Sequence, residues 1–95
     1  MASAEVVRKA VFTEIATLIS RSPDEIMEDM RLIGGDGVLD SMKLVELCVV
    51  LEDKASELGF DFDWTSDAAM SRSRSMFRTA GSLAAEFISQ LEAKR

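Results

Sequence analysis

Residues 41–58 read Ser-Met-Lys-Leu-Val-Glu-Leu-Cys-Val-Val-Leu-Glu-Asp-Lys-Ala-Ser-Glu-Leu. The apolar positions in this segment recur every three or four residues, which is the spacing of one face of an amphipathic helix. They are Leu44, Leu47, Cys48, Leu51, Ala55 and Leu58. Asp40 and Ser41 supply side chains that favour a helix start, and Gly59 follows the last apolar position. The sequence therefore predicts a helix over residues 41–58, the most strongly patterned in the chain.

A helix is also predicted on each side of this segment. Residues 4–20 carry apolar side chains at spacings of three and four, namely Val7, Val11, Ile15, Leu18 and Ile19. Toward the other end, Thr79 can cap a last helix, whose apolar face consists of Leu83, Phe87, Ile88 and Leu91. Three main helices patterned in this way are typical of a small bundle.

Shorter elements are predicted in the connections. Ser22-Pro23-Asp24-Glu25 has the pattern of a capping box with proline at the first helical position, so a short helix is expected there. A second short helix is expected over residues 66–70, before a basic turn at 71–75. Residues 60–64 alternate apolar and acidic side chains, which indicates an extended connector that places its aromatic rings on the core. The predicted fold is all-α, with three main helices plus one or two short helices.

The charge is distributed unevenly along a chain whose length fits one domain, residues 1–95. The net charge is −6, yet residues 24–67 hold thirteen acidic and three basic side chains, a local net charge of −10. Such a segment would repel phosphates, so no nucleic acid partner is expected. It suits a basic protein partner drawn in by electrostatics, or it is a solvated surface that aids solubility, and charge alone favours neither.

Autonomous catalysis is disfavoured by the composition. With no histidine and one cysteine, the chain cannot build a Ser-His-Asp or Cys-His arrangement or a typical zinc site. We therefore expect that the chain is not an enzyme. Cys48 lies in an apolar stretch and is expected to pack in the core. The apolar runs are too short to span a membrane, and residues 1–5 lack the pattern of a signal peptide. We therefore expect no membrane insertion and a cytoplasmic location.

A glycine-rich loop leads into the predicted helix. The segment from residue 32 to residue 47 reads Leu-Ile-Gly-Gly-Asp-Gly-Val-Leu-Asp-Ser-Met-Lys-Leu-Val-Glu-Leu. It resembles the attachment site of acyl carrier proteins and peptidyl carrier domains, with Met42 in place of the commonest leucine. The resemblance implies that Ser41 carries 4′-phosphopantetheine derived from coenzyme A. A helix N-terminus suits an attached phosphate, although a serine at this place is also an ordinary N-cap.

The same resemblance implies docking positions and partners. Acidic residues that precede Ser41 by one position and follow it by five, eleven and twelve match those that carrier proteins present to enzymes: Asp40, Glu46, Glu52 and Asp53. Beside the apolar stripe, Met42, Val45 and Val49 are predicted core side chains, with contacts to a partner or cargo as the alternative. Of these three, Met42 is also assigned to the docking positions, because it directly follows Ser41. The implied partners of this expected monomer are a phosphopantetheinyl transferase, an acyl- or aminoacyl-activating ligase and acyltransferase-type enzymes.

The resemblance covers about residues 14–91 and implies an acyl-carrier-like bundle. It departs at a long connector, about residues 59–79, which exceeds that of a minimal carrier protein by roughly ten residues. The cargo stays open, because a fatty acid, a hydroxy acid, a polyketide unit and an amino acid are all compatible with such an arm. The rival hypothesis is an all-helical interaction domain that recruits its partner through the acidic helix and needs no prosthetic group.

Overall fold

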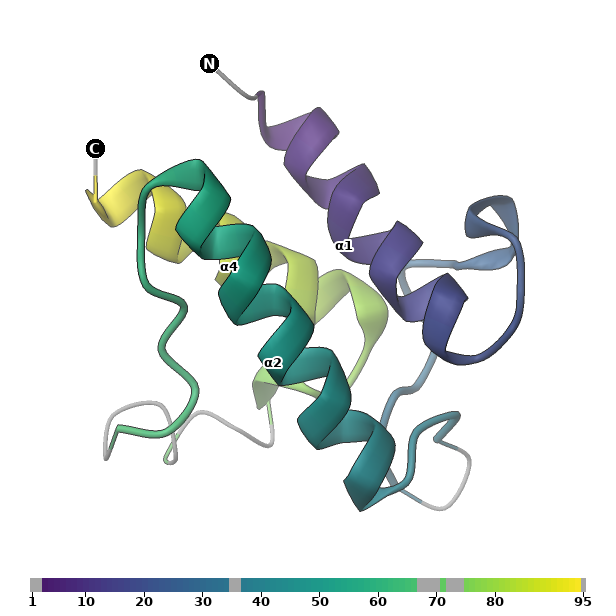
Figure 1. Cartoon of the computed structure of the whole chain (residues 1–95). Coiled ribbons are helices and arrows are strands. Elements are labelled where there is room, and N and C mark those ends of the chain that lie inside the picture. Colours follow the sequence, from purple (N-terminus) through teal and green to yellow (C-terminus); the bar gives the residue numbers. More distant parts are fainter. Residues whose placement is uncertain (1–2, 35–36, 67–70, 72–74, 95) are drawn as a thin grey trace.

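The computed structural model describes residues 3–34, 37–66, 71 and 75–94. Its elements are helix α1 (Ala4–Leu18), the 3-10 turn η1 (Pro23–Glu25), helix α2 (Ser41–Leu58) and helix α4 (Ala80–Lys94), as Figure 1 shows. The described ranges contain no β-strand, although the backbones of Arg31 and Thr79 form an isolated bridge. No helix among them is long and apolar enough to cross a membrane. The prediction of a small all-α bundle is confirmed.

Helix α1 ends two residues earlier than predicted, in a hydrogen-bonded reversal. The N–H of Ser20 donates to the Thr17 carbonyl (3.4 Å) and the N–H of Arg21 donates to the Ala16 carbonyl (2.9 Å). This pattern needs a left-handed residue, and Ser20 provides it with a φ of 58°. The turn η1 follows, where the backbone N–H of Ser22 donates to the Glu25 carboxylate (3.3 Å), as the predicted capping box requires.

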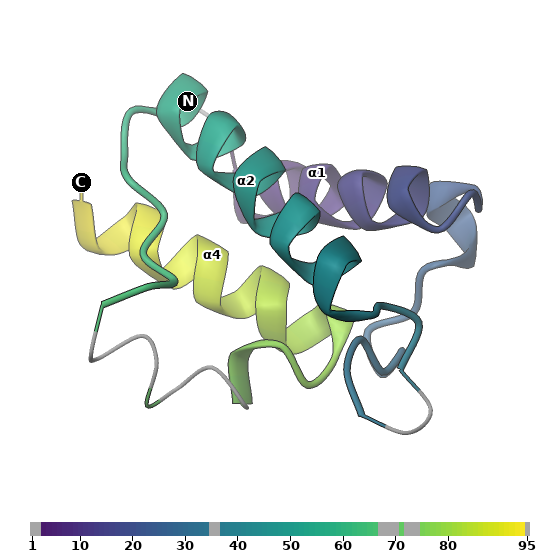
Figure 2. The same ribbon diagram turned by 60° about the horizontal axis from the view of Figure 1, so that its bottom comes forward.

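The core lies between the three helices, with α1 packed against both α2 and α4 (Figure 2). The largest fully buried side chains come from all three helices and from the connection before α2, and burying them supplies most of the stabilisation. They are Phe87, Ile15, Leu32, Leu47, Leu51, Leu83, Val7, Val11 and Cys48. The predicted core position of Cys48 is confirmed.

The extended connector after α2 is fixed to α4. Phe60 and Phe62 are buried, and their ring centroids lie 5.1 Å and 5.2 Å from that of Phe87. The Gln90 side chain accepts a hydrogen bond from the Asp63 N–H (2.6 Å) and donates one to the Asp63 carbonyl (2.9 Å). These contacts confirm that the segment places its aromatic rings on the core. The short helix predicted at 66–70 and the basic turn at 71–75 fall largely outside the described residues.

The start of α4 is joined to the connection between α1 and α2. The N–H of Gly81 donates to the Glu28 carbonyl (2.8 Å), and the N–H of Ala80 donates to the Met30 carbonyl (2.9 Å). The predicted cap is confirmed, because the Thr79 hydroxyl accepts from the N–H of Ser82 (3.1 Å). The segment that leads to α2 is therefore anchored to the last helix.

Candidate functional site

Asp40, and not Ser41, is the N-cap residue of α2. The Asp40 carboxylate accepts from the N–H of Lys43 (2.8 Å), and the Asp40 carbonyl accepts from the N–H of Leu44 (2.9 Å). Ser41 follows as the first helical residue, and it is exposed. No described residue forms a hydrogen bond with its hydroxyl. The N-cap interpretation of Ser41 is therefore wrong, and its oxygen faces solvent.

The loop before Ser41 is held in place by the backbone. Leu39 is buried and its N–H donates to the Leu32 carbonyl (2.9 Å), while Leu32 in turn donates to the Arg78 carbonyl (3.1 Å). At Gly37 a side chain would not fit, because its Cβ would lie 2.7 Å from the carbonyl carbon of Ile33. Packing and hydrogen bonds thus set the position at which the chain enters α2 at Ser41.

The outer face of α2 carries apolar side chains that sequence reasoning placed in the core. Met42 is 76% exposed, Val45 49% and Val49 47%. Their core prediction is wrong, because the buried face uses Leu47 and Leu51, which lie about 140° or more away around the helix from Met42. Large apolar side chains gathered on one exposed face make this face of α2 a candidate contact surface.

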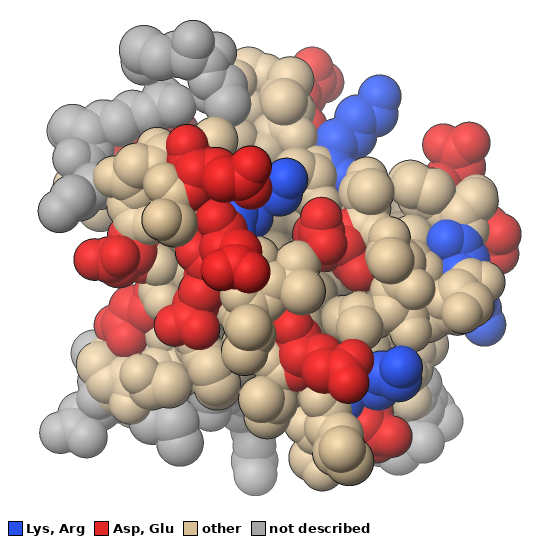
Figure 3. Space-filling view, in the orientation of Figure 1, with Lys and Arg blue, Asp and Glu red and all other residues tan. Residues whose placement is uncertain are grey.

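Acidic side chains share this outer face. Met42, Glu46, Val49 and Asp53 follow one another at spacings of four, three and four, so they form a single stripe along the helix. Figure 3 shows Asp and Glu side chains gathered over α2 and around it. We call Met42, Val45, Glu46, Val49 and Asp53 the outer stripe. Every predicted docking residue is exposed: Asp40 and Met42 lie at the start of α2, Glu46 and Asp53 further along the stripe and Glu52 beside it.

Cys48 lies on the buried face of α2 and takes no part in the outer stripe. Burial, and to a lesser degree the nearby Glu52 carboxylate, raises the pKa of its thiol to about 12. The thiol therefore stays protonated near neutral pH and is a poor nucleophile. Within the described ranges, no three His, Cys, Asp or Glu side chains are grouped so as to hold a metal ion.

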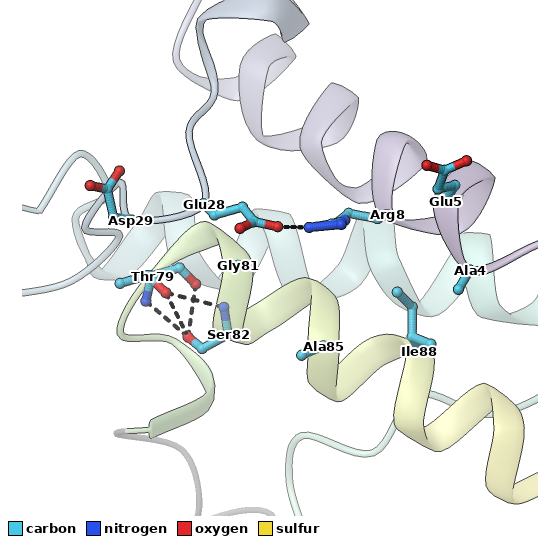
Figure 4. A pocket seen from close by; sticks show the side chains of 10 residues that line it. All are labelled: Ala4, Glu5, Arg8, Glu28, Asp29, Thr79, Gly81, Ser82, Ala85 and Ile88. Atoms are coloured by element: carbon cyan, nitrogen blue, oxygen red, sulfur yellow. Dashed lines mark hydrogen bonds and ion pairs between the residues drawn. The ribbon is translucent and has the colours of Figure 1, made fainter.

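A pocket between α1 and α4 lies away from Ser41. It has a volume of about 550 Å³. An ion pair between Arg8 and Glu28 crosses it, and the Thr79 and Ser82 hydrogen bonds close one end, as Figure 4 shows. None of the predicted site residues lines it.

A smaller pocket adjoins the start of α2, and sequence reasoning missed it. It has a volume of about 300 Å³ and lies between the end of α1 and the beginning of α2. Its lining combines three half-buried apolar side chains with two exposed cations: Leu18, Ile19, Val38, Arg21 and Lys43. We call it the α1–α2 pocket. Its residues come from two segments that are distant in the sequence, so no local sequence pattern predicts the pocket.

No protein-family model matches this chain, and no curated protein and no solved structure matches it.

Proposed function

We propose that this chain is a carrier protein, which bears 4′-phosphopantetheine on Ser41 and passes a thioester-linked acyl or aminoacyl group between partner enzymes. The observation that carries the proposal is the placement of Ser41. It is an exposed first residue of a helix whose cap is provided by its neighbour Asp40. A hydroxyl that stabilises nothing within the described fold is available for modification.

Ser41 fits the arm both sterically and chemically. In the attachment, its oxygen forms a bond to the β-phosphorus of coenzyme A, the pyrophosphate bond breaks, adenosine 3′,5′-bisphosphate leaves, and a base of the transferase takes the hydroxyl proton. No described residue accepts from the backbone N–H groups of Ser41 or Met42, so these donors can face the new phosphodiester. When bound, the arm supplies a terminal thiol that holds the cargo as a thioester.

The outer stripe serves as the docking surface in this proposal. Glu46 and Asp53 attract a basic patch on the partner, and Met42 and Val49, which alternate with them along the stripe, provide apolar contact. The stripe begins one residue after Ser41, so a partner that binds it has its active site within reach of the arm. A phosphopantetheinyl transferase, a ligase and an acyltransferase would use the same surface in turn, which favours a monomeric carrier.

Intact mass spectrometry tests the attachment directly. The apo protein is incubated with a broad-specificity phosphopantetheinyl transferase and coenzyme A, and the expected result is a mass increase of one arm. Ser41→Ala should show no increase. Ser56→Ala is the matched control, because Ser56 is an exposed serine of the same helix and its variant should load normally. A protein that gains no mass, or gains it equally as Ser41→Ala, is not such a carrier.

The exposed apolar part of the outer stripe also favours a second function. Met42, Val45 and Val49 would serve a partner whether or not an arm is present, as in an interaction domain without a prosthetic group. This function predicts that Ser41→Ala complements a deletion strain as well as the parent chain does, whereas Met42→Asp does not. The carrier function predicts that both variants fail.

A further inference from the structure

We propose that the α1–α2 pocket holds the phosphate-proximal part of the arm, with the phosphodiester between Arg21 and Lys43 and the adjoining dimethyl group on Leu18, Ile19 and Val38. This inference rests on the proposed attachment at Ser41. It adds a resting position for the arm, on the side of α2 that faces α1. The outer stripe then stays free for partners.

The pocket is close enough to Ser41 to receive groups attached there. Val38 and Lys43, which line it, lie three residues before and two residues after the serine. Consecutive Cα atoms are 3.8 Å apart, so the Cα of Ser41 lies within about 8 Å of that of Lys43. The phosphorus is bonded directly to the serine oxygen, and Lys43 belongs to the same first turn of α2, so its flexible side chain can turn its ammonium group toward the phosphate.

The charges of the pocket match a phosphodiester. Arg21 and Lys43 are its two cations, in a part of the chain that is otherwise rich in acidic residues. Neither forms an ion pair with a carboxylate among the described residues, whose ion pairs join Arg8 with Glu28 and Lys54 with Glu57. Guanidinium and ammonium groups are the usual partners of phosphate oxygens.

The apolar lining matches the part of the arm next to the phosphate. The phosphate of phosphopantetheine is joined through one methylene to a carbon that bears two methyl groups. Leu18, Ile19 and Val38 are half-buried and line the same pocket as the two cations. Covering part of their surface with these methyl groups is favourable, at about 25 cal/mol per Å² removed from water.

The backbone that carries these side chains is fixed before the arm arrives. The reversal at Ser20 positions Arg21 through its bond to Ala16 (2.9 Å), and the N–H of Val38 donates to the Arg31 carbonyl (3.1 Å). The backbone of Lys43 is held by the hydrogen bond from its N–H to the Asp40 carboxylate (2.8 Å). The backbone of the pocket therefore needs no further ordering when the arm binds, which lowers the entropic cost of binding.

Nuclear magnetic resonance of the loaded protein tests this position. The isotope-labelled chain is loaded with an unlabelled arm, and nuclear Overhauser contacts are measured between the two arm methyl groups and the methyl groups of Leu18, Ile19 and Val38. The phosphorus resonance is recorded in parallel. We expect contacts to all three residues. In Arg21→Gln/Lys43→Gln, the contacts should be lost and the phosphorus resonance should move toward its position in a denatured loaded chain.

Controls separate this inference from the attachment itself. Arg31→Gln removes an exposed arginine whose side chain does not line the pocket, and it should keep the contacts. The single variants Arg21→Gln and Lys43→Gln should each weaken the contacts between the arm and the pocket. If the mass increase occurs but the arm methyl groups contact no pocket residue, or contact Met42, Val45 and Val49 instead, the inference is overturned while the carrier function stands. If no mass increase occurs, both are overturned.

Discussion

The carboxylate of Asp40 accepts a hydrogen bond from the backbone N–H of Lys43 at 2.8 Å, so the residue before Ser41 stabilises the start of α2. We expect Asp40→Ala to lower the free energy of unfolding by about 1 kcal/mol, the usual cost of losing an N-cap. Ser41→Ala should change it by less than about 0.5 kcal/mol, as is usual for an exposed side chain without partners. Urea denaturation followed by circular dichroism measures both. A larger loss in Ser41→Ala would show that the serine is structural.

The glycine three residues before Asp40 is required by close packing. A Cβ on Gly37 would lie 2.7 Å from backbone atoms of Ile33, so Gly37→Ala should lower the free energy of unfolding by about 1–3 kcal/mol. Gly59→Ala is the comparison, since nothing lies within 4 Å of its Cβ position and only its positive φ opposes the change. We expect Gly37→Ala to be the more destabilised of the two in thermal denaturation. Equal losses would contradict the close contact.

The left-handed Ser20 offers a stabilising substitution. A residue with a Cβ is strained at a φ of 58°, and glycine is not, so Ser20→Gly should raise the free energy of unfolding by about 0.5–1 kcal/mol. Thr17→Gly is the control, because it places glycine inside α1 and should lower the same quantity by about 0.3–0.5 kcal/mol. Both are read from urea denaturation midpoints. A lower midpoint for Ser20→Gly would mean that α1 does not end in this reversal.

The outer stripe predicts how loading depends on charge. Glu46→Gln and Asp53→Asn should each lower the kcat/KM of the transferase by about twofold to fivefold, as expected for exposed charge pairs at an interface. Glu92→Gln, which removes the same charge from the far end of α4, should have no effect. The difference should shrink as salt is added, since screening weakens exposed charges. Identical rates for all three variants would place docking elsewhere.

The raised pKa of Cys48 predicts a loss of stability in alkali. Burial, with a smaller contribution from Glu52, raises the pKa of the thiol to about 12, while the thiol of an unfolded chain ionises near about 8.5. At pH values between these two pKa values, the Cys48 thiol keeps its proton in the folded state and loses it in the unfolded state. The stabilisation is complete below the unfolded pKa and is lost as the pH rises toward the folded one.

Comparing pH profiles isolates this effect. Between pH 9 and 11, the free energy of unfolding should fall more steeply for the parent chain than for Cys48→Ala, as measured in urea at each pH. The variant is less stable at every pH because a buried side chain is lost, so the slopes are compared rather than the values. Parallel slopes would show that the thiol ionises equally well in both states.

Local patterns in the sequence were enough to predict the helices. The bounds of α2 follow from its capping residue, its continuous apolar stripe and the glycine that ends it, and the structure places it over the predicted residues. The end of α1 was misplaced because Ile19 fits the apolar spacing as well as Leu18 does. The helix is ended by the backbone conformation of Ser20, which carries no clear signature when the residue is not glycine.

The surroundings of Ser41 were harder to predict because they depend on tertiary packing. Valine and methionine beside a buried stripe can be either buried or exposed. The directions from which α1 and α4 approach α2 decide this, and they leave Met42, Val45 and Val49 exposed. The α1–α2 pocket joins residues 18–21 to residues 38–43, and their proximity follows from the path of the intervening chain. The charge pattern indicated an acidic surface, yet it gave no sign of two cations near the serine.

The hydrogen bonds from Gly81 to Glu28 and from Leu32 to Arg78 make Ser41 dependent on a remote part of the chain. The segment that precedes the serine is completed by backbone groups near the start of the last helix, which is synthesised long afterwards. We therefore expect a growing chain to lack the final conformation around Ser41 until α4 has docked. In that case an unfinished or partly unfolded molecule would be a poor substrate for modification, and the arm would be added to folded chains in preference.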